Sequence, residues 1–358
     1  MSETTKSGAG IKLDPETLFL NPDAYPLEFG QAAMDLVPMT RETYRNSVFL
    51  DRGRIVPAAR RGWHLPLPGL LDEFERRNTG QSPLNFIFHI AHCGSTLLAR
   101  AMDVDGGTLV LREPFPLRQL GAEAATMPTG PRDAPIWKRC LALTAALLGR
   151  RYASDEAVIV KANVPVNFML QPLMALHPDS RGLLLYTGLE RYVLSVLKTP
   201  MHRRWVGNVC GQLAGGIHAT PELGQPDLRQ LSTPQAAACL WAAQMLRFRS
   251  ALGQDTRLRS LDCETFFANP VQTLTRSLQH FGVDLPLAEA ERIAASELFS
   301  HHAKDTARRY SREARERELD QLRSSLADDL KAAMQWIEDA GLGDLALPEA
   351  SALNSSDL

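Results

Sequence analysis

The strongest constraint on the fold is an alternation of short, continuously apolar runs with helical patterns between residues 84 and 282. Apolar residues occupy neighbouring positions in each run, so each strand is expected to be buried on both faces. Helices between such strands indicate a parallel sheet. We therefore predict a three-layer α/β/α fold with a central parallel sheet. The expected strands are 84–90, 107–113, 156–162, 181–187 and 257–264, and the expected helices are 135–152, 166–177, 189–198, 233–252, 269–282 and one that begins at 95.

The N-terminal part differs in composition from the rest of the chain. Residues 1–12 are small and polar, and we expect them to be disordered. Residues 13–80 are rich in proline and charge and read as a cap segment, with short helical patterns at 25–37 and 67–77. The turn-forming sequence "NTGQSP" ends this segment. The main α/β domain is then predicted to span 81–345.

Three later segments have their own expectations. Residues 199–233 are rich in glycine, and we expect a mobile segment that forms part of an acceptor pocket or a lid. Residues 300–342 are highly charged and indicate solvated helix. The tail 346–358 is predicted to be disordered.

Composition excludes some classes of function. The chain has 358 residues, a net charge of −2 and 44% apolar residues, so it has no global attraction for nucleic acid or an anionic membrane. We find no apolar run near the roughly 18 residues of a membrane span and no secretory leader. The five cysteines are scattered without zinc-ligand spacing, which indicates reduced thiols, no metal and a cytoplasmic protein. We expect a small-molecule partner, and the oligomeric state stays open.

The motif "HCGSTL", His92 to Leu97, follows the first core strand and begins a helix. A small, glycine-containing turn between a strand and a helix aims backbone N–H groups at an oxyanion. Gly94 permits close approach, and Ser95 and Thr96 add hydroxyl donors. The alternative is an ordinary turn in which Ser95 caps the helix.

The same motif differs from the loop of nucleoside triphosphatases. That loop places a lysine directly after its last glycine, where this chain has Ser95 after Gly94. The difference argues against a Mg-dependent triphosphate site.

The motif resembles the 5′-phosphosulfate loop of sulfotransferases that use 3′-phosphoadenosine 5′-phosphosulfate (PAPS). In the approximate family pattern [RK]-S-G-[ST]-T-x-L, His92 replaces the loop cation and Cys93 the small serine. Gly94, Ser95, Thr96 and the following leucines match. The resemblance implies that His92, Cys93, Gly94, Ser95, Thr96 and Leu97 bind PAPS, without a metal.

Further segments extend the resemblance over about residues 84–310. "SLDCETFFANPVQTLTRSLQHFGVDL" is similar to the late strand–helix unit of the family, and "VIVKANVPVN" resembles its "pKtHlP" segment, with Asn163 in place of the histidine. "LLLYTGLERYVLSVLK" resembles the 3′-phosphate segment, which implies that Ser195 contacts that phosphate. Thr187 replaces the usual arginine there, so Arg191 is the expected substitute. Lys304 and Arg308 are expected to close over the same phosphate.

The general base is expected to be Glu113. In tyrosylprotein- and heparan-type members the base is a glutamate beyond the second strand, and Glu113 lies at that place in "TLVLREPFPL". Lys161 is the expected cation for the bridging oxygen, while His92 and His89 are further base candidates. The alternative for Glu113 is an ion pair with Arg112 or a turn cap.

Three functions are compatible with these residues. The first is transfer of a sulfuryl group from PAPS to a hydroxyl or amine acceptor. The second is a P-loop kinase. The third is a noncatalytic relative that binds a nucleotide or a partner, favoured by Thr187 and His92.

Overall fold

The computed structural model describes residues 15–56, 62–77, 82–127, 129–154, 156–302, 305–309 and 312–353. Lys304 lies outside these ranges, and for Arg308 they cover the backbone only.

A five-stranded parallel sheet forms the centre of the molecule, in the order β5-β6-β4-β7-β8. The strands of this sheet are β4 (Asn85–His89), β5 (Thr108–Arg112), β6 (Ala157–Lys161), β7 (Gly182–Tyr186) and β8 (Leu258–Asp262). Nearly every residue in these strands is buried, because helices cover both faces of the sheet. The predicted three-layer α/β fold and its five core strands are therefore confirmed.

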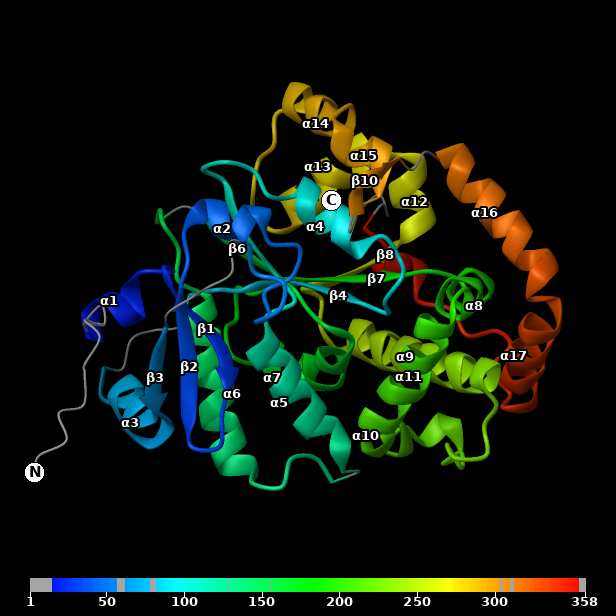
Figure 1. The fold of residues 1–358 in the computed structure, drawn as a ribbon, viewed down its shortest axis with the longest axis horizontal. Helices are drawn as coiled ribbons and strands as arrows, with labels where there is room; N and C mark the ends of the chain where they lie inside the picture. Colours follow the sequence, from blue (N-terminus) through cyan, green and yellow to red (C-terminus); the bar gives the residue numbers. More distant parts are fainter. Residues whose placement is uncertain are drawn as a thin grey trace, which may run out of the picture.

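Helices lie on the two sides of this sheet (Figure 1). The 22-residue helix α11 (Thr233–Gln254) begins with a capping box between Ser232 and Gln235, has proline in its first turn, and is buried along most of its length. The other main-domain helices are α4 (Ser95–Ala101), α5 (Phe115–Thr126), α6 (Ala134–Leu148), η1 (Val164–Met169), α7 (Leu170–Met174), α8 (Leu189–Leu197), α9 (Pro200–Gln212), α10 (Ala214–His218), η2 (Pro221–Leu223), α12 (Cys263–Ala268), α13 (Pro270–His280), α14 (Leu287–Ala294), α15 (Glu297–Ser300), α16 (Arg312–Ser325), α17 (Ala327–Asp339) and η3 (Glu349–Ser351).

The N-terminal part forms a small antiparallel sheet. The sheet consists of β1 (Ala24–Phe29), β2 (Ala33–Pro38) and β3 (Trp63–Pro66). The helices of this part are α1 (Pro15–Leu20), α2 (Arg41–Asn46) and α3 (Leu67–Arg77). The helical pattern expected at 25–37 is wrong, since these residues form the β1–β2 hairpin, closed by a hydrogen bond from Gly30 N to Ala33 O. The third strand that stabilises it, β3, lies far along the chain, so a local pattern could not reveal it.

Arg112 joins this N-terminal part to the central sheet. Its guanidinium is 1% exposed and donates to the backbone carbonyls of Tyr44, Arg45 and Ser47. It also pairs with Asp103. Because Arg112 is occupied in this way, it is not the partner of Glu113.

Several segments differ from their sequence-based expectations. The helix α5 was not expected, and both Pro116 and Gly121 lie within it. Pro116 lies in the first turn, where proline is tolerated, and a Cβ on Gly121 would lie 2.7 Å from the Pro165 backbone. The helix expected at 166–177 is split into η1 and α7. The segment 199–233 contains the helices α9 and α10, which were not expected there, while its mobility stays a prediction.

The C-terminal part also holds more structure than expected. A short hairpin of β9 (His301–His302) and β10 (Asp305–Arg309) precedes the charged helices α16 and α17. Residues 346–353, expected within a disordered tail, pack against the sheet instead. Leu353 is fully buried and its N–H donates to Ser260 O at the edge strand β8. Leu347 is also buried, so two leucines anchor this segment.

Candidate functional site

Polar side chains gather at the carboxyl edge of the central sheet. The loop after β4, Glu113 after β5, Asn163 beyond β6 and Thr187 after β7 all follow strands that run in the same direction. The strand connections diverge between β4 and β7, since β4 leads toward β5 and β7 leads toward β8. Such a switch point is where open α/β sheets bind ligands.

The loop after β4 has an unusual backbone. Ala91, His92 and Gly94 have φ values of 72°, 53° and 76°. A Cβ on Gly94 would lie 2.8 Å from Cζ of Phe267, so both its φ and its packing require glycine. Ser95 and Thr96 begin α4 and are buried. A turn that combines left- and right-handed residues points successive N–H groups in one direction, which suits an anion.

A cavity of about 890 Å³ opens beside this loop. It lies over the ends of β4, β7 and β8, and part of its outer wall is the helix α16. Hydroxyl groups, cations and aromatic rings are combined in its wall, a mixture typical of a nucleotide pocket. The lining residues are His92, Gly94, Ser95, Thr96, Leu97, Thr187, Arg191, Ser195, Lys198, Thr199, Met201, His202, Cys263, Phe267, Phe299, His301, Arg315, Glu318, Leu319, Gln321, Leu322 and Ser325.

Three of the cations in this cavity are held by carboxylates. Arg191 lies 3.0 Å from Glu264 and 3.3 Å from Glu316, and Arg315 hydrogen-bonds Glu264 and lies over the ring of Phe267. Burial alone would raise the pKa of Glu264, but the hydrogen bond and the charge of Arg315, with smaller contributions from Cys263 and Arg191, together outweigh burial and lower that pKa.

The third of these cations is Lys198, whose ammonium lies 3.5 Å from the Glu318 carboxylate. Glu316 and Glu318 both belong to α16. Two of the three cations are thus paired with carboxylates of the same outer helix.

A second polar cluster surrounds Glu113, on the other side of β4. Lys161 Nζ donates to one carboxylate oxygen, and Asn163 Nδ2 donates to the other at 3.0 Å. Glu113 N also donates to Lys161 O at 2.7 Å, which continues the pairing of β5 with β6. The Glu113 side chain is 17% exposed and that of Lys161 1%. Two side-chain donors therefore fix the carboxylate, while the Glu113 side chain remains partly accessible to solvent.

The structure brings most of the predicted binding residues together. One cavity is lined by His92 together with Gly94, Ser95, Thr96, Leu97, Arg191 and Ser195. The His92 ring packs against His202 and Trp205, with centroid separations of 4.9 and 5.5 Å.

Two predicted residues are placed differently from expectation. Cys93 was expected in the binding set, but its side chain is 1% exposed and its thiol points into the sheet, 3.6 Å from Leu185 O. Lys161, expected at a bridging oxygen, instead has its ammonium on Glu113.

Lys198, Arg315 and Phe267 were not recognised in the sequence. Lys198 had a usable signal, because Arg191, Ser195 and Lys198 follow i, i+4, i+7 spacing and so share one face of α8. Arg315 had none, since it is one of many arginines in a charged helix.

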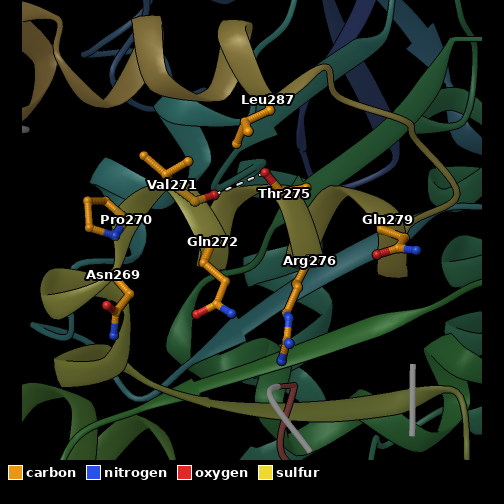
Figure 2. Close-up of a pocket in the computed structure, with 8 residues that line it drawn as sticks. All are labelled: Asn269, Pro270, Val271, Gln272, Thr275, Arg276, Gln279 and Leu287. Carbon is orange, nitrogen blue, oxygen red and sulfur yellow. Dashed lines mark hydrogen bonds between the residues drawn. The ribbon is translucent and has the colours of Figure 1, made fainter. Parts of the chain in front are cut away.

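A second hollow, of about 600 Å³, lies along α13 (Figure 2). Its walls come from α13, Asn269 and Leu287, and no residue of the sheet edge lines it. The Thr275 hydroxyl donates to Val271 O within its own helix. We assign no chemistry to this hollow.

Within the described ranges, no cluster of three or more histidine, cysteine or acidic side chains could hold a metal ion. Among the described helices, none combines the length and the apolar content that a membrane crossing requires.

Comparisons with known proteins give distant likenesses only. No family model and no curated protein matches this chain. Among solved structures, a sulfotransferase from Alicyclobacillus acidocaldarius is 16% identical, covers 73% of this chain and 97% of its own, and has a TM-score of 0.35. The sulfotransferase domain of the curacin biosynthetic pathway is 14% identical, with coverages of 75% and 100% and a TM-score of 0.41. A mouse sulfotransferase solved in complex with adenosine 3′,5′-bisphosphate (PAP) is 13% identical, with coverages of 75% and 93% and a TM-score of 0.32.

Proposed function

We propose that this protein transfers a sulfuryl group from PAPS to the hydroxyl or amine of a small molecule. The observation that carries the proposal is the position of the β4 loop. It lies between a nucleotide-sized cavity on one side and a fixed, partly exposed carboxylate, Glu113, on the other. A transfer reaction needs a donor site and a base on opposite sides of the group that moves.

The donor nucleotide is assigned to the cavity. The loop N–H groups and the hydroxyls of Ser95 and Thr96 would hold the 5′-phosphosulfate. Arg191 and Ser195, on one face of α8, would hold the 3′-phosphate, with Lys304 and Arg308 proposed to close over it. The rings of Phe267 and Phe299 in the same wall offer apolar contact for the adenine ring of the nucleotide.

Glu113 is assigned as the general base. As the acceptor oxygen or nitrogen attacks sulfur, its proton passes to a Glu113 carboxylate oxygen. The bond from sulfur to the bridging oxygen of PAPS breaks, and adenosine 3′,5′-bisphosphate (PAP) leaves as the anion. Lys161 and Asn163 hold the carboxylate in position throughout.

Binding and turnover test this proposal directly. Calorimetry should give binding of PAP that is tighter than that of AMP and unaffected by Mg²⁺. PAPS consumption should then depend on one of a panel of phenols, alcohols and amines. A preference for ATP with Mg²⁺ would support the kinase alternative and contradict the proposal.

A noncatalytic nucleotide-binding role is the second candidate. It is favoured by the ion pairs of Arg191 with Glu264 and Glu316, which occupy the cation that the 3′-phosphate would need. PAP binding without PAPS consumption over the whole panel would favour this role.

A further inference from the structure

His89 lies between the loop and Glu113, hydrogen-bonded to the loop and 3.9 Å from the carboxylate. It is the last residue of β4 and is 4% exposed. Its Nδ1 accepts a hydrogen bond of 3.0 Å from the N–H of Ala91, inside the loop. Its Nε2 lies 3.9 Å from Oε1 of Glu113. One buried ring therefore joins the backbone of the candidate anion loop to the candidate base.

The Ala91 hydrogen bond fixes where the ring carries its proton. Because Nδ1 accepts from an N–H group, its lone pair is directed at Ala91, and the proton of the neutral ring must be on Nε2. The ring nitrogen that carries the proton is then the one 3.9 Å from Oε1 of Glu113, and a carboxylate oxygen can only accept. In this tautomer the ring has no lone pair available to take a proton from a substrate, so His89 cannot serve as the base.

The backbone at His89 is held by a buried amide network. Asn167 Nδ2 donates to the backbone carbonyl of His89 at 3.0 Å and to Gln244 Oε1 at 2.9 Å. Both residues that the ring connects have left-handed backbones, with φ of 72° at Ala91 and 56° at Glu113. Such conformations persist only where the surrounding contacts hold them.

We propose that His89 is a positioning residue that couples the shape of the anion loop to the placement of Glu113. When the loop holds its anion, the Ala91 N–H fixes the ring, and Nε2–H keeps the carboxylate directed at the acceptor. This inference rests on the proposed function for the identity of the anion and of the base.

Nitrogen-15 NMR of the histidine rings tests the geometry without any turnover. We expect the His89 ring in the unliganded protein to be neutral with its proton on Nε2. Its Nε2 resonance should shift in Glu113→Gln, and it should stay in place in the control Glu123→Gln, which changes an exposed glutamate on α5. A ring protonated on Nδ1, or an unchanged resonance in Glu113→Gln, would overturn the proposal.

Two variants test the roles of the two ring nitrogens of His89 separately. His89→Asn keeps an acceptor near Nδ1, so PAP affinity should stay within about twofold while kcat falls on the order of 10²-fold. His89→Gln keeps a donor near Nε2, so kcat should stay within a few-fold while PAP affinity falls about threefold to tenfold. His64→Gln, which changes an exposed histidine on β3, is the control and should change neither quantity.

Equal losses of kcat and affinity in both variants would mean a purely structural role and would refute the coupling. If the wild-type protein neither binds PAP nor consumes PAPS, the proposed function fails. The ring tautomer and its response to Glu113→Gln still decide whether His89 contacts that carboxylate.

Discussion

At the scale of single residues, the proposed function depends most on Glu113, the proposed general base. Lys161 and Asn163 each donate to one of its carboxylate oxygens, and Arg112, its neighbour in sequence, is directed into the N-terminal segment. Its environment therefore holds the carboxylate in one position, in a side chain that is still 17% exposed.

Replacing Glu113 by glutamine tests its role as base. The amide keeps the size of the side chain but cannot take a proton, so turnover should fall on the order of 10²–10⁴-fold. PAP affinity, measured by calorimetry, should remain within about twofold because the cavity lies on the other side of β4. Near-normal turnover in Glu113→Gln would remove the base assignment, and Glu123→Gln serves as the surface control.

Replacing Arg191 by alanine tests the 3′-phosphate site. A charge-assisted phosphate contact contributes about 1.5–3 kcal/mol, so Arg191→Ala should weaken PAP much more than AMP, which lacks the 3′-phosphate. Calorimetry with both ligands measures the difference. An equal loss of affinity for PAP and AMP would show that Arg191 does not contact the 3′-phosphate.

At the scale of elements, α16 forms one wall of the cavity, and three ion pairs join it to α8 and the residue after it. Its Glu316 and Glu318 pair with Arg191 and Lys198, and its Arg323 pairs with Glu190. Ion pairs that are partly exposed contribute little each and weaken with salt. The helix can therefore give up its contacts to a phosphate at small cost.

This arrangement predicts competition between Glu316 and the ligand. If the phosphate must displace the carboxylate from Arg191, Glu316→Gln should raise PAP affinity severalfold at low salt. The gain should shrink at high salt, where the wild-type pair is already weakened. Calorimetry at two ionic strengths measures it, with the exposed Glu291→Gln on α14 as the control. Weaker binding in Glu316→Gln would show that the carboxylate supports the site.

At the scale of the whole molecule, all five cysteines are free and buried. Burial raises the pKa of the Cys93 thiol to about 11, against an ordinary value of 9.0, and the Lys161 ammonium partly opposes the shift. Burial also raises the pKa of Cys210 to about 12. The folded protein therefore keeps these thiols protonated at a pH where the unfolded chain loses their protons.

The free energy of unfolding should consequently fall as the pH rises from about 9 to about 11. Below pH 9 both states hold the proton, and the contribution of Cys93 is fully present. Above pH 9 the unfolded chain is stabilised by ionisation and the folded protein is not. Cys93→Ala should remove on the order of 2 kcal/mol of this pH dependence, whatever its effect at pH 8. Urea unfolding at pH 8 and at pH 11 measures the change, and an unaltered slope in the variant would contradict it.

The local sequence determined the sheet and the loop that follows β4. Continuous apolar runs at consecutive positions can only be buried on both faces, so they fixed the three-layer fold and placed polar residues at the strand ends. The glycine in "HCGST" indicated the turn, because glycine readily adopts a positive φ such as the 76° found at Gly94. These features depend on neighbours in the chain and can be read there.

Tertiary structure alone decided which polar groups meet. His89 and Glu113 are 24 residues apart, yet the strand order brings them to 3.9 Å. Arg191 meets Glu316 across 125 residues, and β2 finds β3 after a long connection, which is why the hairpin at 25–37 resembled a helix. The thiol of Cys93 turned inward because the loop backbone directs it so. Pairings over such distances follow from topology and packing, and no local spacing encodes them.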